Sequence, residues 1–194
     1  MSRTFFAVAV IVLFASAVFA QQTMGAKTES GDSCLMYGKD HMFAIKAPTG
    51  WTVDAATGKK LGLHAVMYPQ DSSWREAPAT IYSNFVHKNP DLTTIEKIVA
   101  DDIAGYKKDS PTVIIQDAEP LPLGAGKEKV LVKIYRGDKG NNFEEVAYID
   151  ESKVVIMLVL SARNEKEFVA SLPLFKELVH SYRFISDTVT ISQP

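Results

Sequence analysis

The sequence predicts an α/β (α+β) fold, a three-layer α/β/α sandwich in which helices cover both faces of a mainly antiparallel sheet. One observation is the run of seven apolar residues from Val154 to Leu160, typical of a central strand covered on both faces. A second is a helical period of apolar residues at 93–108 and at 164–182. A third is the short links between the β-rich runs of the second half, which favour antiparallel hairpins.

The first half of the chain holds three predicted strand regions. A short strand at Met42–Ile45 is followed by a turn at Pro48-Thr49-Gly50, because proline restricts φ and glycine relaxes it, and Trp51 continues beyond the turn. Apolar residues occupy every second position at 61–67, and 79–87 repeats this period. We expect these last two strands to be neighbours in the sheet.

The first predicted helix covers Thr93–Lys108. Its apolar residues fall on one face and its charged residues on the other. Thr93 and Glu96 have the spacing of a capping box, in which each side chain satisfies a backbone amide at the start of the helix.

The second predicted helical region covers Asn164–Tyr182. It opens with Asn164 and Glu167 in capping positions, and an apolar stripe follows. Pro173 is expected to break or kink it, which leaves a short turn and then a main helix from about Leu174.

Four β-rich runs fill the rest of the second half. Tight glycine-containing or polar links separate them, as expected for hairpins. The runs are Thr112–Asp117, Lys127–Tyr135, Phe143–Asp150 and Lys153–Ser161.

Residues 1–20 have the pattern of a secretory signal peptide. Arg3 precedes an apolar run from Phe5 to Ala20, and Val18 with Ala20 suits cleavage before Gln21. A retained anchor is the alternative, but the run is short against the roughly 20 residues that span a bilayer. We therefore expect a secreted or periplasmic protein with no stable membrane span after cleavage.

The mature chain is expected to contain a flexible lead-in at 21–32, one domain at 33–185 and a frayed tail at 186–194. The lead-in is small, polar and without an apolar period. Cys34 is the single cysteine, so an internal disulfide is impossible. A buried, inert thiol is expected there, with an intermolecular bridge or a reactive thiol as the alternative.

Composition argues against nucleic acid as a partner. Without the leader, 20 basic residues face 23 acidic ones, because only Arg3 is removed from the total of 21. Binding a phosphate backbone requires a basic stripe that this balance lacks.

Motifs for catalysis are weak. The segment Gly31–Cys34 is similar to the nucleophile block of a GDSL-type esterase, but no apolar strand precedes it and no Asp-x-x-His pair occurs. The Gly124-Ala125-Gly126 segment is followed by a predicted strand, whereas a phosphate loop requires a helix there. We expect no catalytic residue and no cofactor.

The four histidines, His41, His64, His87 and His180, lack the close spacing of metal ligands. A site assembled from distant strands stays open because His64 and His87 fall on the two strands expected to pair. Surface or half-buried imidazoles are the favoured interpretation, so no metal is expected.

The loop from Tyr68 to Glu76 is the best candidate for partner binding. It places Trp74 beside Arg75 among polar residues, and both residue types are common where proteins dock partners. Tyr68, Trp74, Arg75 and Glu76 are therefore the candidate contacts. The alternative is that Trp74 folds back and caps the open end of the core.

The order of four segments resembles the PsbP-like superfamily, which includes extrinsic photosystem subunits, a small Ran-binding nuclear import factor and bacterial envelope proteins of the DcrB-like group. The resemblance implies an α/β/α sandwich and an accessory or binding role without a shared catalytic site. No photosynthetic metal role carries over, because no residues match one. The four segments are Phe43–Trp51, Ser73–Tyr82, Leu92–Glu96 and Phe175–Tyr182.

The sequence thus predicts a monomeric, non-enzymatic accessory or binding module of the cell envelope, which acts through a surface loop and a crevice between sheet and helix. A carrier of a small apolar ligand between sheet and helix is the alternative. An envelope hydrolase is the third possibility, for which no nucleophile and base pair is evident.

Overall fold

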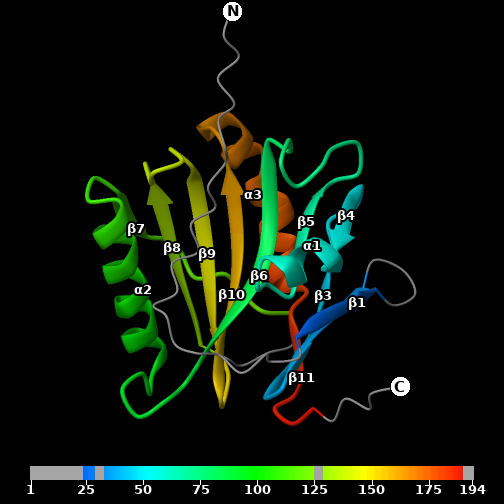
Figure 1. Cartoon of the computed structure of the whole chain (residues 1–194), viewed down its shortest axis with the longest axis vertical. Helices are drawn as coiled ribbons and strands as arrows, with labels where there is room; N and C mark the ends of the chain where they lie inside the picture. Colours follow the sequence, from blue (N-terminus) through cyan, green and yellow to red (C-terminus); the bar gives the residue numbers. More distant parts are fainter. Residues whose placement is uncertain (1–23, 29–32, 125–128, 190–194) are drawn as a thin grey trace, which may run out of the picture.

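The computed structural model describes residues 24–28, 33–124 and 129–189. Within these ranges the chain forms two antiparallel sheets and three helices (Figure 1). In chain order the elements are β1 (Gly25–Thr28), β2 (Ser33–Gly38), β3 (His41–Lys46), β4 (Trp51–Asp54), α1 (Ala55–Lys60), β5 (Ala65–Pro69), β6 (Ala79–His87), α2 (Ile95–Asp109), β7 (Ile114–Asp117), β8 (Val130–Arg136), β9 (Phe143–Asp150), β10 (Val154–Ala162), α3 (Glu165–His180) and β11 (Arg183–Ser186).

The larger sheet has seven strands in the order β4-β5-β6-β10-β9-β8-β7, with every neighbouring pair antiparallel. β10 lies at its centre, and eight of its nine residues are buried. The prediction of a central strand at Val154–Leu160 is therefore confirmed. β5 and β6 are neighbours, as the alternating patterns indicated.

The large sheet carries a helix on each face (Figure 1). Ile95, Ile98 and Val99 of α2 join a cluster with Tyr135, Tyr148 and neighbouring residues of β8, β9 and β10. Phe168, Phe175, Leu178 and Val179 of α3 pack on the opposite face, over β10, β6 and β9. The contacts of α2 and α3 with the large sheet are stabilised by this burial of apolar surface, which contributes about 25 cal/mol per Å².

The smaller sheet, with the order β1-β2-β3-β11, was not predicted as a separate unit. It packs beside α3 on the large sheet through Met36, Phe43 and Ile45. β1 at Gly25–Thr28 lies inside the segment predicted as a flexible lead-in, so that prediction is wrong for these four residues. Backbone hydrogen bonds to β2 order this polar segment, and they require no apolar period.

The alternation at 61–67 predicted a longer strand than the one that forms. Asp54 caps the short helix α1 by accepting from the backbone N–H of Thr57, and β5 begins only at Ala65. Gly62 has φ of +74°, which ends the helix in a conformation that glycine adopts most readily. Leu61 and Leu63 therefore belong to a turn.

The helix predictions are confirmed with two corrections. The cap of α2 is Thr94 and not Thr93, because the Thr94 hydroxyl accepts from the Lys97 amide and the backbone of Thr94 is extended. Asn164 caps α3 as predicted. Pro173 lies inside α3 without breaking it, since apolar contacts of Phe168 and Phe175 hold the helix on both sides of the proline.

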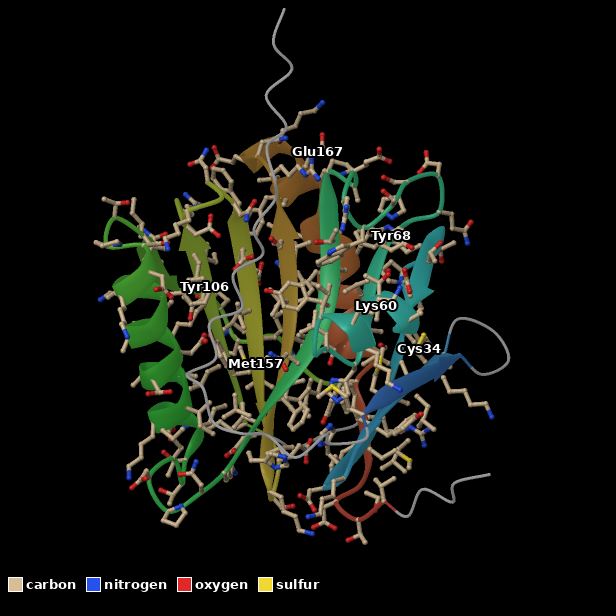
Figure 2. The ribbon with its side chains drawn as sticks, viewed as in Figure 1. Cys34, Lys60, Tyr68, Tyr106, Met157 and Glu167 are labelled. Carbon is tan, nitrogen blue, oxygen red and sulfur yellow. The ribbon has the colours of Figure 1, made fainter. Side chains whose placement is uncertain are left out.

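Cys34 lies on β2 with 1% of its surface exposed, which matches the expected buried thiol (Figure 2). The predicted signal peptide at 1–20 lies outside the described residues and stays a prediction. No helix in the described ranges has the length and apolar character that a membrane span requires.

Candidate functional site

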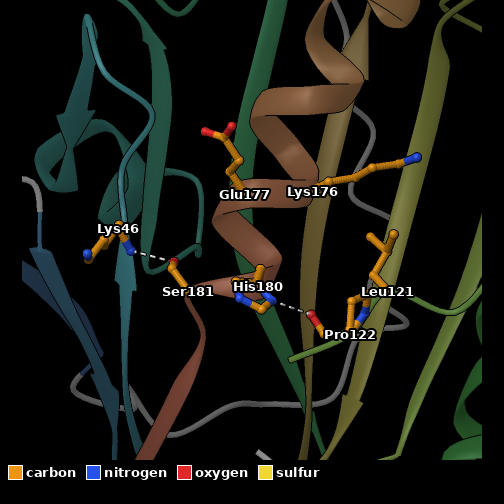
Figure 3. Close-up of a pocket in the computed structure, with 7 residues that line it drawn as sticks. All are labelled: Lys46, Leu121, Pro122, Lys176, Glu177, His180 and Ser181. Carbon is orange, nitrogen blue, oxygen red and sulfur yellow. Dashed lines mark hydrogen bonds between the residues drawn. The ribbon is translucent and has the colours of Figure 1, made fainter. Parts of the chain in front are cut away.

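An open groove runs beside the C-terminal half of α3. It has a volume of about 560 Å³ and lies where the end of α3 meets β3 and the segment after β7 (Figure 3). A smaller hollow of about 140 Å³ adjoins it and shares Lys46, Glu177 and Ser181. The residues that line the main groove are Lys46, Leu121, Pro122, Lys176, Glu177, His180 and Ser181.

Hydrogen bonds fix the walls of this groove. The Lys46 amide donates to Ser181 Oγ at 2.8 Å, which ties β3 to the end of α3. His180 Nδ1 lies 3.2 Å from the Pro122 carbonyl oxygen, and the Gly124 amide donates to the His180 carbonyl at 2.8 Å. Three segments that are distant in sequence are thus held together around the groove.

The rim of the groove is polar and mixed in charge. Lys46, Lys176, Glu177 and His180 are exposed, and Leu121 is buried in its floor. Below Lys176, Glu145 of β9 is 3% exposed, and burial raises the pKa of its carboxyl, with the Lys176 charge acting in the opposite direction. The groove therefore offers an apolar floor with charged edges.

The predicted partner-binding loop places Trp74 against Tyr82, on the face of the large sheet that carries α2. Trp74 is half-buried, and its ring meets the Tyr82 ring edge-on at a centroid distance of 6.2 Å. Arg75 and Glu76 are exposed. Tyr68 is on β5, outside the loop, and donates to the Asp54 carboxylate at 3.0 Å.

A buried network of tyrosines and carboxylates lies between α2 and the sheet. Tyr148 and Tyr135 both donate to the Asp102 carboxylate. Tyr106 of α2, labelled in Figure 2, donates to Glu144 at 2.6 Å. Burial is the main cause that raises the pKa of Asp102, and it raises the pKa of Glu144 to about 7. In the described part of the chain no ion pair neutralises either carboxylate.

The histidines meet in a combination that sequence reasoning missed. His64 contacts His41 through their Nε2 atoms at 2.6 Å, whereas the expected neighbour His87 lies near Asp40 instead. Their separation of 23 residues has no motif that would signal it. No group of three or more potential metal ligands occurs among the residues that the structure describes.

A serine and a histidine do meet, but in a place unsuited to catalysis. Ser83 Oγ lies 3.1 Å from His64 Nδ1, and both side chains are 0% exposed. The other ring nitrogen of His64 faces His41, so no carboxylate orients it as in a hydrolase triad. A substrate cannot reach this serine without opening the core.

Comparisons with known proteins support a fold and no more. No protein-family model matches the chain, and no curated protein matches it in sequence. The solution structure of PsbP from the cyanobacterium Synechocystis sp. PCC 6803 (CyanoP) is similar, with a TM-score of 0.50 and 12% identity over 90% of this chain and 99% of that one. A mutant of the protein Mog1 is also similar, with a TM-score of 0.43 and 12% identity over 86% of this chain and 97% of that one.

The chain therefore has a PsbP-like fold, which confirms the resemblance noted in its sequence. An identity of 12% carries the fold alone, so the function must be argued from the chain's own surfaces.

Proposed function

We propose that this protein is a non-enzymatic accessory or binding module of the cell envelope, exported by a signal peptide that is cleaved before Gln21. The observation that carries the proposal is the position of Trp74, a half-buried aromatic ring on a loop outside any strand, with Arg75 and Glu76 exposed beside it. Tryptophan and arginine dominate the energetics of many protein interfaces. The loop therefore acts as the contact surface for a protein partner.

The loop is ordered before any partner arrives. The Ser72 amide donates to Pro69, and the Glu76 and Ala77 amides donate to Ser73, all within 3.0 Å. Arg163 also donates to the Arg75 carbonyl. A loop held in this way loses little conformational entropy on binding, and less of the interaction energy is therefore spent on ordering it.

The proposal treats the domain as a three-layer α/β/α sandwich, with α2 and α3 as the outer layers. In this framework the loop that carries Trp74 and the groove beside α3 belong to opposite faces of one sheet. A module of this kind presents surfaces to other macromolecules and needs no reactive centre. The inaccessible Ser83 and His64 pair supports this non-enzymatic interpretation.

A second candidate function is transport of a small apolar ligand. The space between the large sheet and α3 is already filled by Phe168 and Phe175, which are 2% and 0% exposed. A carrier would therefore hold its ligand in the open groove, against Leu121 and Pro122. Release of a lipid or another small molecule from the purified protein on denaturation would favour this alternative.

Site-specific photo-crosslinking in living cells tests the proposed function. A photoreactive amino acid replaces Arg75 in one strain and Val169, which is 57% exposed on α3, in the control strain. We expect a covalent adduct with one envelope protein from position 75 and none from position 169. Equal adducts from both positions would contradict the proposed contact surface.

The purified partner then allows a direct measurement. Truncating a central aromatic anchor typically weakens binding by 10-fold or more, so we expect that loss for Trp74→Ala. Because Trp74 also packs on Tyr82, the exposed Arg75→Ala variant is measured beside it, with Val169→Ala as the control. Amino-terminal sequencing of the periplasmic protein should begin at Gln21, and retention of residues 1–20 would contradict export by cleavage.

A further inference from the structure

Two histidines from different sheets meet inside the core. His41 begins β3 of the small sheet, and His64 precedes β5 of the large sheet, where its amide donates to the Ser83 carbonyl at 3.1 Å. Both side chains are 0% exposed, and their Nε2 atoms are 2.6 Å apart. The contact is therefore a buried polar link across the interface between the two sheets.

Hydrogen bonds limit the protons that this pair can hold. His64 Nδ1 lies 3.3 Å from the Ser83 carbonyl oxygen, which only accepts, and 3.1 Å from the Ser83 hydroxyl, which can donate or accept. When both rings are neutral, one Nε2 atom donates to the other, and the two rings share a single hydrogen at their contact. His41 Nδ1 is buried without a hydrogen-bond partner in the described part of the chain.

The surroundings of the pair are apolar and tightly packed. The Phe85 ring lies 4.3 Å from the His41 ring, and the Phe43 ring lies 5.4 Å from the His64 ring, measured between centroids. A Cβ atom at Gly38 would fall 2.4 Å from His41 Cε1, so the ring packs closely on the end of β2. An imidazolium formed here would have little room for hydrating water.

The charged groups around the pair offer it little compensation. His87 on β6 and Asp40 in the β2–β3 turn act on His41 in opposite directions, and Asp40 lies 3.8 Å from His87 Nδ1. Lys39 in the same turn acts on His87. Glu151 accepts a hydrogen bond from Tyr182, whose ring packs on Phe43.

We propose that the His41 and His64 pair is an acid-sensitive latch, which holds the small sheet on the large sheet when both rings are neutral and releases it when they are protonated. An added proton must enter at an Nδ1 atom of the pair, of which the one on His41 has no hydrogen-bond partner in the described part of the chain, or it must displace the hydrogen bond between the rings. A second proton would place two cations at the distance of one hydrogen bond. The strands of the large sheet keep their own hydrogen bonds during this opening.

The direction of the pH response follows from linkage. Burial is the main cause that lowers the pKa of His41 to about 4 and that of His64 to about 3, whereas a hydrated histidine titrates near 6.5. The open state, with the small sheet released, therefore binds protons more tightly than the closed state. The population of the open state rises as pH falls below about 6.5. At pH 5 the equilibrium constant for opening is raised about 30-fold by each ring and about 1000-fold by both rings together.

Thiol labelling of Cys34 reports this opening. Cys34 is the only cysteine, is 1% exposed and lies on β2 of the small sheet. A pyridyl disulfide reagent labels thiols in acid, and the urea-unfolded protein corrects for its intrinsic rate at each pH. We expect the corrected labelling rate to rise at least 100-fold from pH 7 to pH 5, with an unchanged far-ultraviolet circular dichroism spectrum. A corrected rate independent of pH would overturn the proposal.

The double variant His41→Gln with His64→Asn removes both titrations and retains amide N–H donors. We expect its labelling rate to change less than 5-fold over the same pH range, whereas the His180→Gln control, at an exposed site on α3, keeps the full response. A double variant whose labelling rate depends on pH as strongly as that of the unsubstituted protein would overturn the proposal. An NMR titration of the imidazoles of the unsubstituted protein tests the proposal without relying on the folding of a variant. Titration midpoints near pH 6.5 for His41 and His64 would also overturn the proposal.

Discussion

We predict that Glu144 makes the folded protein less stable as pH rises from about 4.5 to 7. Its side chain is 6% exposed and accepts a hydrogen bond from Tyr106. Burial raises its pKa from 4.5 to about 7, so the folded protein binds a proton there that the unfolded chain has lost. Stability from this group is therefore present below about pH 4.5 and is lost as pH rises through 7.

The magnitude follows from the size of the shift. The pKa of Glu144 rises from 4.5 in the unfolded chain to about 7 in the folded protein. At about 1.4 kcal/mol for each tenfold change in proton affinity, this rise lowers the free energy of unfolding by about 3 kcal/mol above pH 7. Glu144→Gln removes the ionisation and leaves a carbonyl oxygen that still accepts from Tyr106. We expect the variant to match the unsubstituted protein near pH 4.5 and to exceed its free energy of unfolding by about 3 kcal/mol at pH 8.5.

Urea denaturation followed by circular dichroism at pH values between 4.5 and 8.5 measures this difference. His41 and His64 change the free energy of unfolding with pH in the opposite direction. They do so equally in the variant and in the unsubstituted protein, so their contribution cancels when the two free energies are subtracted. Glu76→Gln, at an exposed position of the Trp74 loop, serves as the control and should show no such difference. A difference in unfolding free energy that is the same at both ends of the pH range would refute the assignment of a buried, uncompensated carboxyl.

Two further predictions concern α3. Phe175 is 0% exposed between the helix and the sheet, so Phe175→Ala should lower the free energy of unfolding by about 3–5 kcal/mol in urea, whereas Val169→Ala on the exposed side should change it by less than about 0.5 kcal/mol. An equal effect at both positions would contradict the packing of α3. Asn164 accepts from the Glu167 amide at 3.0 Å, so Asn164→Ala should lower the stability of the protein by about 1 kcal/mol, whereas Asn164→Asp should retain most of that stability. Thermal denaturation measures this, and equal stability of the two variants would argue against the cap.

Most strands and both long helices could be predicted because their signals are local. The apolar run at Val154–Leu160 corresponds to β10, and the helical periods correspond to α2 and α3. Each pattern reflects which side chains one element must bury, and this is written within a few residues of the chain. The ends of the helices could be predicted less well. Thr93 and Thr94 are adjacent and both carry a hydroxyl that could cap α2, and only the backbone conformation determines that Thr94 does so.

The candidate sites were only partly predictable. Trp74 and Arg75 could be found because their residue types are typical of interfaces. The α3 groove could not, because it forms where Lys46, Pro122 and Ser181 meet, and these residues are far apart in sequence. The buried Glu144 was missed since two adjacent glutamates near the start of a β-rich run give no sign of burial, which depends on the helix that covers each of them.

The sequence by itself determined the two long helices, most strands of the large sheet with its central strand, and the mixed α+β class, since short-range periodicity controls which residues of one segment face the same side. Tertiary structure alone decided that Gly25–Thr28 and Arg183–Ser186 join a second sheet, and that His41 contacts His64 across the interface. Pairing between distant strand edges depends on which unsatisfied backbone groups approach one another, and a linear pattern of side chains does not encode that approach.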